Sequence, residues 1–253
     1  MEHLSVLRNH VLRQAGNTDV PNPLSVSLLN SFGTGGRTGS ATYSFNSGSF
    51  GDSRVLAGDI IFMALLVTNG PTPITSHTMD INGDAFTVIP TVNGGGSENE
   101  PVIMAGYRVA TTDYDDAVSP VVVTCNFGSG SQSTYNVLWI GARIRNSETS
   151  ALYAYDSGVS TSTNDFLTAN YVEKGYVLAF AIGTPSESEI PTITGTGAEI
   201  LSTYYSGADI DSSAYSMIAR VGYTTNTDNL SLTVNHNILA FTPVLSSLVV
   251  CFH

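Results

Sequence analysis

The feature that most constrains the fold of this chain is an apolar run at Leu56–Thr68, LAGDIIFMALLVT, which opens with a turn-like Gly-Asp pair. The run is too short to span a bilayer and is rich in residues that favour strands, so it predicts a strand buried on both faces. A similar run, KGYVLAFAIG, occurs at Lys174–Gly183, and aligning Gly58 with Gly175 gives an offset of 117 residues. The recurrence predicts that the chain contains the same structural motif twice.

The composition favours an all-β fold. Hydrophobic residues make up 42% of the 253 residues, charged residues only 12%, and there are 24 glycines. Apolar runs alternate with segments rich in Ser, Thr, Asn and Gly, which is typical of many short strands joined by tight polar turns. A chain of this length can bury a sizeable core, and β-sandwiches of this size are often single domains.

The charge is strongly negative. Nine basic residues against 21 acidic residues give a net charge of −12, and Lys174 is the only lysine. Because a negative surface repels phosphate backbones, we do not expect nucleic acid as a partner. No run reaches membrane length and the N-terminus lacks a secretory h-region, so we expect synthesis in a cytoplasm and no membrane partner.

The two cysteines, Cys125 and Cys251, each lie inside an apolar, strand-like run. A free cysteine packs as a small hydrophobic residue, so the sequence predicts two buried thiols in preference to a disulfide.

The N-terminus contains the one convincing helix candidate. Residues Met1–Ala15 place apolar side chains on one face before a glycine stop, and Asn17–Pro23 has the two prolines of an extended linker. A helix this short is marginal alone, so it must dock onto its own domain or a partner. The expected docking residues of this arm are Leu4, Leu7, Arg8, Val11 and Arg13.

Turn signals divide the rest of the chain into strands. Leu24–Leu29 and Ala41–Phe45 are the first candidates, and the glycine-rich segment SFGTGGRTGS between them is expected to be a flexible loop, since it lacks the Gly-Lys-Ser/Thr ending of a phosphate loop. The Asn82-Gly83 pair between alternating residues predicts a two-residue hairpin with a type I′ turn.

The alternating strands predict a sandwich over residues 24–253 after the arm and linker at 1–23, with a first half at about 24–145 and a second at about 172–253. Matching PVIMAGYRVATT with YSMIARVGYTT places Arg108 against Arg220, an offset of 112 residues, and loop-length changes would account for the drift. No proline- or charge-rich linker separates the halves, so they are expected to share a core.

Arg108 and Arg220 each stand in the middle of a predicted strand. One interpretation is that each arginine lays its aliphatic stem on the sheet and keeps its guanidinium in water. The other is that they form fixed ion pairs with the acidic turns Asp113–Asp116 and Asp209–Asp211, or with a neighbouring subunit.

Four tyrosines next to Ser, Gly and Asp form a candidate binding face: Tyr153, Tyr155, Tyr204 and Tyr205. Tyrosine offers rigid area with a polar tip, which suits sugars or protein, although strand-edge tyrosines are also common without such a role.

No catalytic or metal-binding signature accompanies these residues. The clustered carboxylates lie among turn-forming residues, and the five histidines show no pair with metal-ligand spacing. The sequence therefore predicts no catalytic residue, no metal site and no cofactor.

Three strand patterns of the first half carry a resemblance: Ala57-Gly58-Asp59-Ile60-Ile61, Tyr107-Arg108-Val109-Ala110-Thr111 and Asn136–Ile144. Their counterparts in the second half are Gly175–Ala181, Ile218–Val221 and Leu245–Cys251. From about residue 50 to the end, the chain resembles a class of phage and bacterial surface β-domains. The resemblance implies a jelly-roll-like sandwich that serves as a virion part. The helical arm, Tyr176 and the lack of a tryptophan after the first hairpin depart from that pattern.

The hypothesis is therefore a non-enzymatic virion structural protein. The resemblance implies a capsid decoration (cement) protein, attached through its N-terminal arm to the major capsid protein or other virion proteins, as a homo-oligomer with a trimer favoured. The alternative is a carbohydrate-binding fibre or adhesin tip that contacts a host glycan. A third hypothesis is a polysaccharide-degrading enzyme.

Overall fold

The computed structural model describes residues 25–38, 40–45, 54–68, 72–94, 101–127, 133–147, 154–160, 164–170, 176–183, 192–196, 198–208, 215–224, 229–235 and 245–252. All regular secondary structure within these ranges is β-strand, and every pairing between strands is antiparallel. This confirms the all-β prediction. Over the same ranges there is no helix long and apolar enough to cross a membrane. The expected helical arm, residues 1–23, lies outside them.

The strands up to residue 145 form two sheets. Inner sheet I has the order β1 (Ser25–Thr38), β9 (Ser133–Arg145), β3 (Ile60–Thr68), β7 (Pro101–Val109) and β6 (Thr87–Asn93). Outer sheet I has the order β2 (Ser40–Phe45), β8 (Val121–Asn126), β4 (Thr78–Ile81) and β5 (Asp84–Ala85). We call this pair of sheets the first sandwich.

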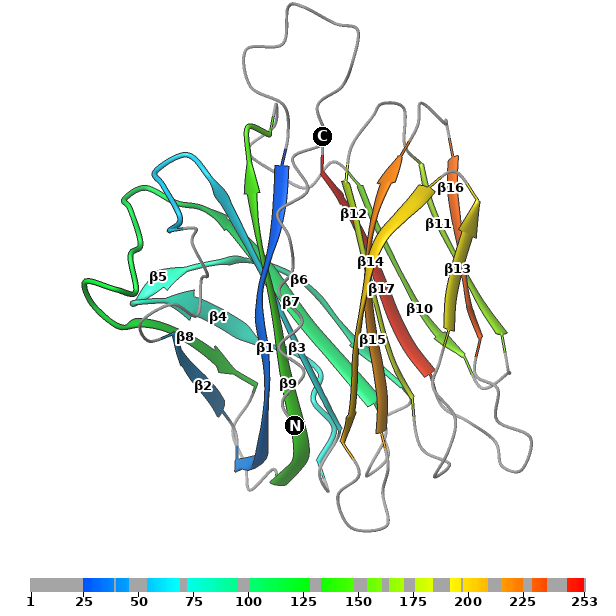
Figure 1. The fold of residues 1–253 in the computed structure, drawn as a ribbon. Coiled ribbons are helices and arrows are strands. Elements are labelled where there is room, and N and C mark those ends of the chain that lie inside the picture. Colours follow the sequence, from blue (N-terminus) through cyan, green and yellow to red (C-terminus); the bar gives the residue numbers. More distant parts are fainter. Residues whose placement is uncertain are drawn as a thin grey trace, which may run out of the picture.

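The strands from residue 154 onward form two more sheets. Inner sheet II has the order β10 (Ala154–Ser160), β17 (Leu245–Phe252), β12 (Tyr176–Gly183), β15 (Tyr215–Thr224) and β14 (Ala198–Ala208). Outer sheet II has the order β11 (Asn164–Asn170), β16 (Asn229–Asn235) and β13 (Thr192–Thr196). Figure 1 shows the four sheets as successive layers, with outer sheet I at the left and outer sheet II at the right. Strands β10 and β11 belong to these sheets although they precede residue 172.

The two inner sheets have the same strand order, and the two outer sheets match except that outer sheet I has one further strand, β5. In the first sandwich the ladders are nested, because β1 pairs with β9, β2 with β8 and β3 with β7. In the second pair β10 pairs with β17, β11 with β16 and β12 with β15. The two recurring apolar runs supply β3 and β12, which are the middle strands of the two inner sheets.

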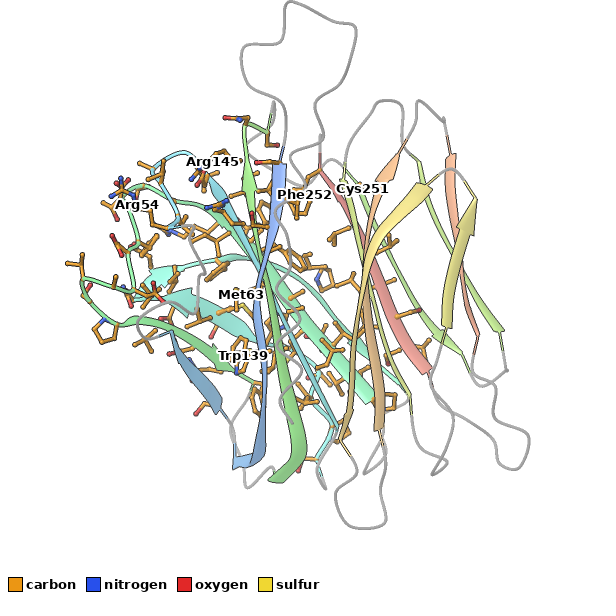
Figure 2. The ribbon with its side chains drawn as sticks, viewed as in Figure 1. Arg54, Met63, Trp139, Arg145, Cys251 and Phe252 are labelled. Atoms are coloured by element: carbon orange, nitrogen blue, oxygen red, sulfur yellow. The ribbon has the colours of Figure 1, made fainter. Side chains whose placement is uncertain are left out.

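Strand β3 is buried on both faces, as the sequence predicts. Successive side chains point to opposite faces, so Ile61, Met63, Leu65 and Val67 face outer sheet I. They form the first core with the largest buried side chain, Trp139, and with the residues of outer sheet I. Figure 2 shows Met63 and Trp139 inside the first sandwich.

The opposite face of β3 packs against the second half. Ile60, Phe62, Ala64 and Leu66 form the central core with three residues of β17: Leu248, Val250 and Phe252. The rings of Phe62 and Phe252 meet edge to face, with centroids 6.0 Å apart at 76°. The Ser246 hydroxyl donates to the carbonyl of Pro101 over 2.8 Å. Residues from both halves therefore contribute to one buried cluster.

The hairpin prediction is confirmed, whereas the glycine-rich loop prediction is wrong. Asn82 and Gly83 have φ angles of 51° and 87°, the two positive values that a type I′ turn needs, and they join β4 to β5. The glycine-rich segment instead lies in β1, where residues 32–38 pair with β9 after a register shift between Leu29 and Phe32. The ladder to a 13-residue neighbour overrides the low strand propensity of glycine.

His77 lies at an irregularity in the pairing of β6 with β7, at the edge of inner sheet I. The register between β6 and β7 shifts after Ile89, where Pro90 has no N–H to donate. The buried His77 lies there, with Nε2 3.0 Å from the Ala105 carbonyl and Nδ1 2.9 Å from the Thr91 hydroxyl. A carbonyl only accepts, so Nε2 carries the proton of the neutral ring. Burial lowers the pKa of His77.

Candidate functional site

Two segments are joined by backbone hydrogen bonds at one end of the first sandwich. They are residues 54–59, which precede β3, and residues 110–119, which connect β7 to β8. Val55 and Tyr114 form an isolated bridge, with N to O distances of 3.1 and 2.9 Å. The Ala57 amide donates to Oδ1 of Asp113 over 2.9 Å. We call these two segments, together with Arg143 and Arg145 of β9, the joined end.

The Gly-Asp pair of the sequence motif makes the turn of the joined end. Gly58 has a φ of +94°, which L side chains rarely adopt. Its amide donates to the Ala110 carbonyl over 2.8 Å, and the Ala110 amide donates to the Asp59 carbonyl over 2.8 Å. The Asp59 carboxylate also accepts from the Leu56 amide over 2.9 Å. These bonds fix the backbone of both segments.

Asp59 and Arg145 form a bidentate ion pair. Arg145 donates from Nε to Oδ1 over 3.0 Å and from Nη2 to Oδ2 over 2.9 Å. The Asp59 side chain is 5% exposed and that of Arg145 is 31% exposed. The hydrogen bonds that Arg145 donates to Asp59 raise the pKa of the Arg145 guanidinium. Bidentate hydrogen bonds between an arginine and a carboxylate are stronger than hydrogen bonds between neutral groups.

Arg143 is the buried arginine of this end, at 7% exposure. It donates from Nη1 to the Arg54 carbonyl over 3.0 Å and from Nη2 to the Ser27 hydroxyl over 2.9 Å. Its Nε is buried without a hydrogen-bond partner in the part of the chain described here. Burial lowers the pKa of Arg143, and the charge of Arg145 lowers it further.

The Arg54 side chain is exposed, and its carbonyl also accepts from Nη2 of Arg145 over 3.3 Å. Figure 2 shows Arg54 and Arg145 at the same end of the first sandwich. Three arginines therefore belong to this end of the first sandwich, and within the described residues one of them, Arg145, makes an ion pair, with Asp59.

Arg108, one of the two arginines singled out from the sequence, forms its ion pair with Asp84 of β5. Nη2 of Arg108 lies 3.1 Å from the Asp84 carboxylate, and Nη1 donates to the Ala85 carbonyl over 3.0 Å. The Tyr114 hydroxyl donates to the same carboxylate over 3.0 Å. Burial raises the pKa of Tyr114, and its hydrogen bond to Asp84 adds to that effect. The partner of Arg108 is thus a hairpin residue of its own chain.

The acidic turn of residues 113–118 has a defined shape. The Asp115 carboxylate accepts from the Ala117 amide over 3.0 Å, and its carbonyl accepts from the amides of Val118 and Ser119 over 3.1 Å each. Tyr114 is buried beneath the turn, whereas Val118 at its tip is 82% exposed. The turn therefore presents carboxylates and one apolar side chain on a fixed backbone.

The other predicted site residues lie in strands of which the backbone is described, or outside the described residues. Arg220 stands in β15 opposite Ala179 of β12. Tyr155 lies in β10 and Tyr204-Tyr205 in β14, at the two opposite edges of inner sheet II. With three strands between them, these edges are roughly 19 Å apart. Residues outside the described ranges are Tyr153 and the arm residues Leu4, Leu7, Arg8, Val11 and Arg13.

Both cysteines are free and buried, which confirms the thiol prediction. Burial raises the pKa of Cys125 and of Cys251 to about 12. A thiol of that pKa carries almost no thiolate at neutral pH and is inert as a nucleophile. Among the described residues, no group of three or more His, Cys, Asp or Glu side chains is arranged to hold a metal ion.

Sequence reasoning missed Asp59, Arg143 and Arg145. One signal was available, because GARIR places two arginines at alternate positions of a strand, on the same face as Trp139. Charges on a buried face need partners, so this spacing indicates an ion pair. It does not indicate which acid supplies the carboxylate.

The chain matches no protein-family model, no curated protein and no solved structure. The joined end offers guanidinium groups, carboxylates and one exposed apolar side chain on a fixed backbone. Such a surface is suited to binding charged groups of another molecule.

Proposed function

We propose that the chain is a non-enzymatic structural protein of a virion, a decoration (cement) protein that binds and stabilises the capsid. The observation that carries the proposal is the nested pairing of strands, first with last and second with next to last, in both halves. This is the pairing expected of a jelly roll, in which a long antiparallel hairpin is rolled into two sheets. Jelly rolls recur in viral capsid and lectin domains.

The proposal includes a duplication, in which the two halves are two jelly rolls joined through the central core. Its support is the common strand order and the central place of β3 and β12. The match of Arg108 with Arg220 supports the duplication less. Arg108 pairs with Ile61 of β3, and Arg220 pairs with Ala179 of β12. The match of Gly58 with Gly175 places Ile61 against Leu178 and not against Ala179, so the two matches disagree by one residue in the pairing.

A decoration protein needs a stiff body and a means of attachment. The body has an inner sheet I packed on both faces, with β3 fully buried from residue 60 to residue 67. For attachment we propose the arm at residues 1–23, which would dock on the major capsid protein or another virion protein. In this proposal the chain works as a homo-oligomer on the virion, in keeping with its resemblance to phage surface β-domains.

The test is binding of the full-length chain and of a variant lacking residues 1–23 to purified capsid shells of the encoding virus, with copy number read from a quantitative gel. A Leu4→Asp/Leu7→Asp variant is the matched control, because it keeps the length of the arm and removes its apolar face. We expect saturation at a copy number comparable to that of the capsid subunit for the full-length chain only.

Binding at a few copies per shell would instead indicate a fibre. Absence of binding by all three proteins would overturn the capsid proposal. The carbohydrate-binding alternative would then be tested on a glycan array, since lectins share the jelly roll.

A further inference from the structure

The charge of the chain limits where two copies can touch. Each copy carries a net charge of −12, so two copies repel one another over most of their surfaces. A contact between copies is therefore favoured where the few basic groups can meet carboxylates. Three of the nine basic residues, Arg54, Arg143 and Arg145, belong to the joined end, where the guanidiniums of Arg143 and Arg145 both donate to the Arg54 carbonyl.

Within the described residues, only Arg145 of these three arginines forms an ion pair. Arg145 takes Asp59 in a bidentate pair, whereas the contacts of Arg143 are a carbonyl and a hydroxyl. The guanidiniums of Arg143 and Arg145 repel each other, and a further carboxylate on the solvent side would relieve that repulsion. The exposed Arg54 side chain is where such a carboxylate can approach.

The acidic turn beside these arginines supplies the complementary group. Asp113 and Asp115 are at least partly exposed, and Val118 next to them is 82% exposed. The bridge between Val55 and Tyr114 and the bond from Ala57 to Asp113 hold this turn against the arginine segment. Because the backbone is already fixed, little conformational entropy is lost when the surface is covered.

We propose that the joined end is a self-association surface, on which Arg54 and Arg145 of one copy receive Asp113 and Asp115 of a second copy. Patches of opposite charge lie side by side on one rigid surface, so the surface is complementary to another copy of itself. Val118 supplies an apolar contact within the charged surface. This inference extends the homo-oligomer of the proposed function and names its contact.

The experiment is sedimentation velocity of the full-length chain, without capsid shells, over a range of concentrations. The variants are Arg54→Glu, Asp115→Arg and the double variant Arg54→Glu/Asp115→Arg. Each single variant places like charges across the contact, so we expect self-association to weaken by about tenfold or more. The double variant exchanges the two charges and restores association. The wild-type association weakens as salt is added.

Thr75→Glu and Thr75→Arg are the matched controls, because Thr75 is exposed and lies outside the joined end. Both should associate like the wild type, and Trp139 fluorescence checks that every variant is folded. A monomeric wild type at all concentrations, unchanged association of the single variants, or no recovery in the double variant would overturn the proposal. Since no shells are present, these results are independent of the capsid-binding test.

Discussion

The two faces of β3 are held in different ways. Among the described side chains, the central core is apolar apart from the Ser246 hydroxyl, and Phe62 of β3 meets Phe252 of β17 there. The first core is also apolar in its middle, but its rim carries three polar attachments: the Asp59–Arg145 pair, the Arg108–Asp84–Tyr114 group and His77. One strand thus serves two cores with different chemistry.

This difference predicts how each core responds to solution conditions. Burial of apolar area depends little on pH or on moderate salt, so the contact between the halves should be insensitive to both. Ion pairs and a buried histidine respond to pH and salt, so the rim of the first sandwich should be sensitive. The halves are therefore joined by apolar area, whereas the loops at the end of the first sandwich are positioned by charge.

The largest expected effect comes from Phe252→Ala in β17. Loss of a buried phenylalanine costs about 3–5 kcal/mol of the free energy of unfolding. Trp139, the only tryptophan, lies in the first core, so its fluorescence reports whether a change in the second half reaches the first. We expect one urea transition at a lower midpoint. An unchanged Trp139 transition would show that the halves unfold independently, and Val159→Ala, at a 45% exposed site of β10, is the control.

Next in size is Asp59→Asn, which leaves Arg145 without its counter-charge while the amide oxygen can still accept from Leu56. Removing one partner of a fully buried pair costs several kcal/mol, and the partial exposure of Arg145 reduces this to roughly 1–3 kcal/mol. Urea unfolding of Asp59→Asn, Arg145→Gln and the double variant measures the coupling. Additive losses would mean that the pair does not stabilise the fold.

His77 gives a smaller effect that depends on pH. Its native pKa lies below the ordinary 6.5, so above that pH both the native and the unfolded chain hold a neutral ring and stability is full. As the pH falls below 6.5, the unfolded chain binds the proton first, and stability is lost until the native pKa is passed. Urea midpoints between about pH 7.5 and about pH 5 should fall more for the wild type than for His77→Gln. Parallel slopes for the two proteins would contradict this role.

The smallest effect is expected from Asp84→Asn. The Asp84 side chain is 49% exposed, so water screens its pair with Arg108 and the loss should be about 0–1 kcal/mol. The small loss of stability in Asp84→Asn should vanish in high salt, whereas the loss in Asp59→Asn should persist in part. Thermal unfolding of both variants at low and high salt measures these losses. A larger loss for Asp84→Asn than for Asp59→Asn would contradict the prediction that the Asp59–Arg145 pair stabilises the fold more than the Asp84–Arg108 pair.

Local patterns in the sequence predicted the parts of the fold that depend on near neighbours. An apolar run without alternation leaves no face for water, so β3 had to be buried on both sides. The Asn82-Gly83 pair fixed a hairpin because few residues adopt positive φ at both positions. Cys125 and Cys251 were expected to be buried because their neighbours are apolar.

Contacts between distant residues were decided by the tertiary structure. Asp59 and Arg145 are 86 residues apart, and they meet because β3 and β9 are neighbours in one sheet. Arg108 was identified as a charged strand residue, but its partner Asp84 depended on the placement of β5. The glycine-rich segment became strand because β9 lay beside it. Periodicity specifies which residues form a strand, whereas register and sheet order specify which side chains meet, and these depend on the whole chain.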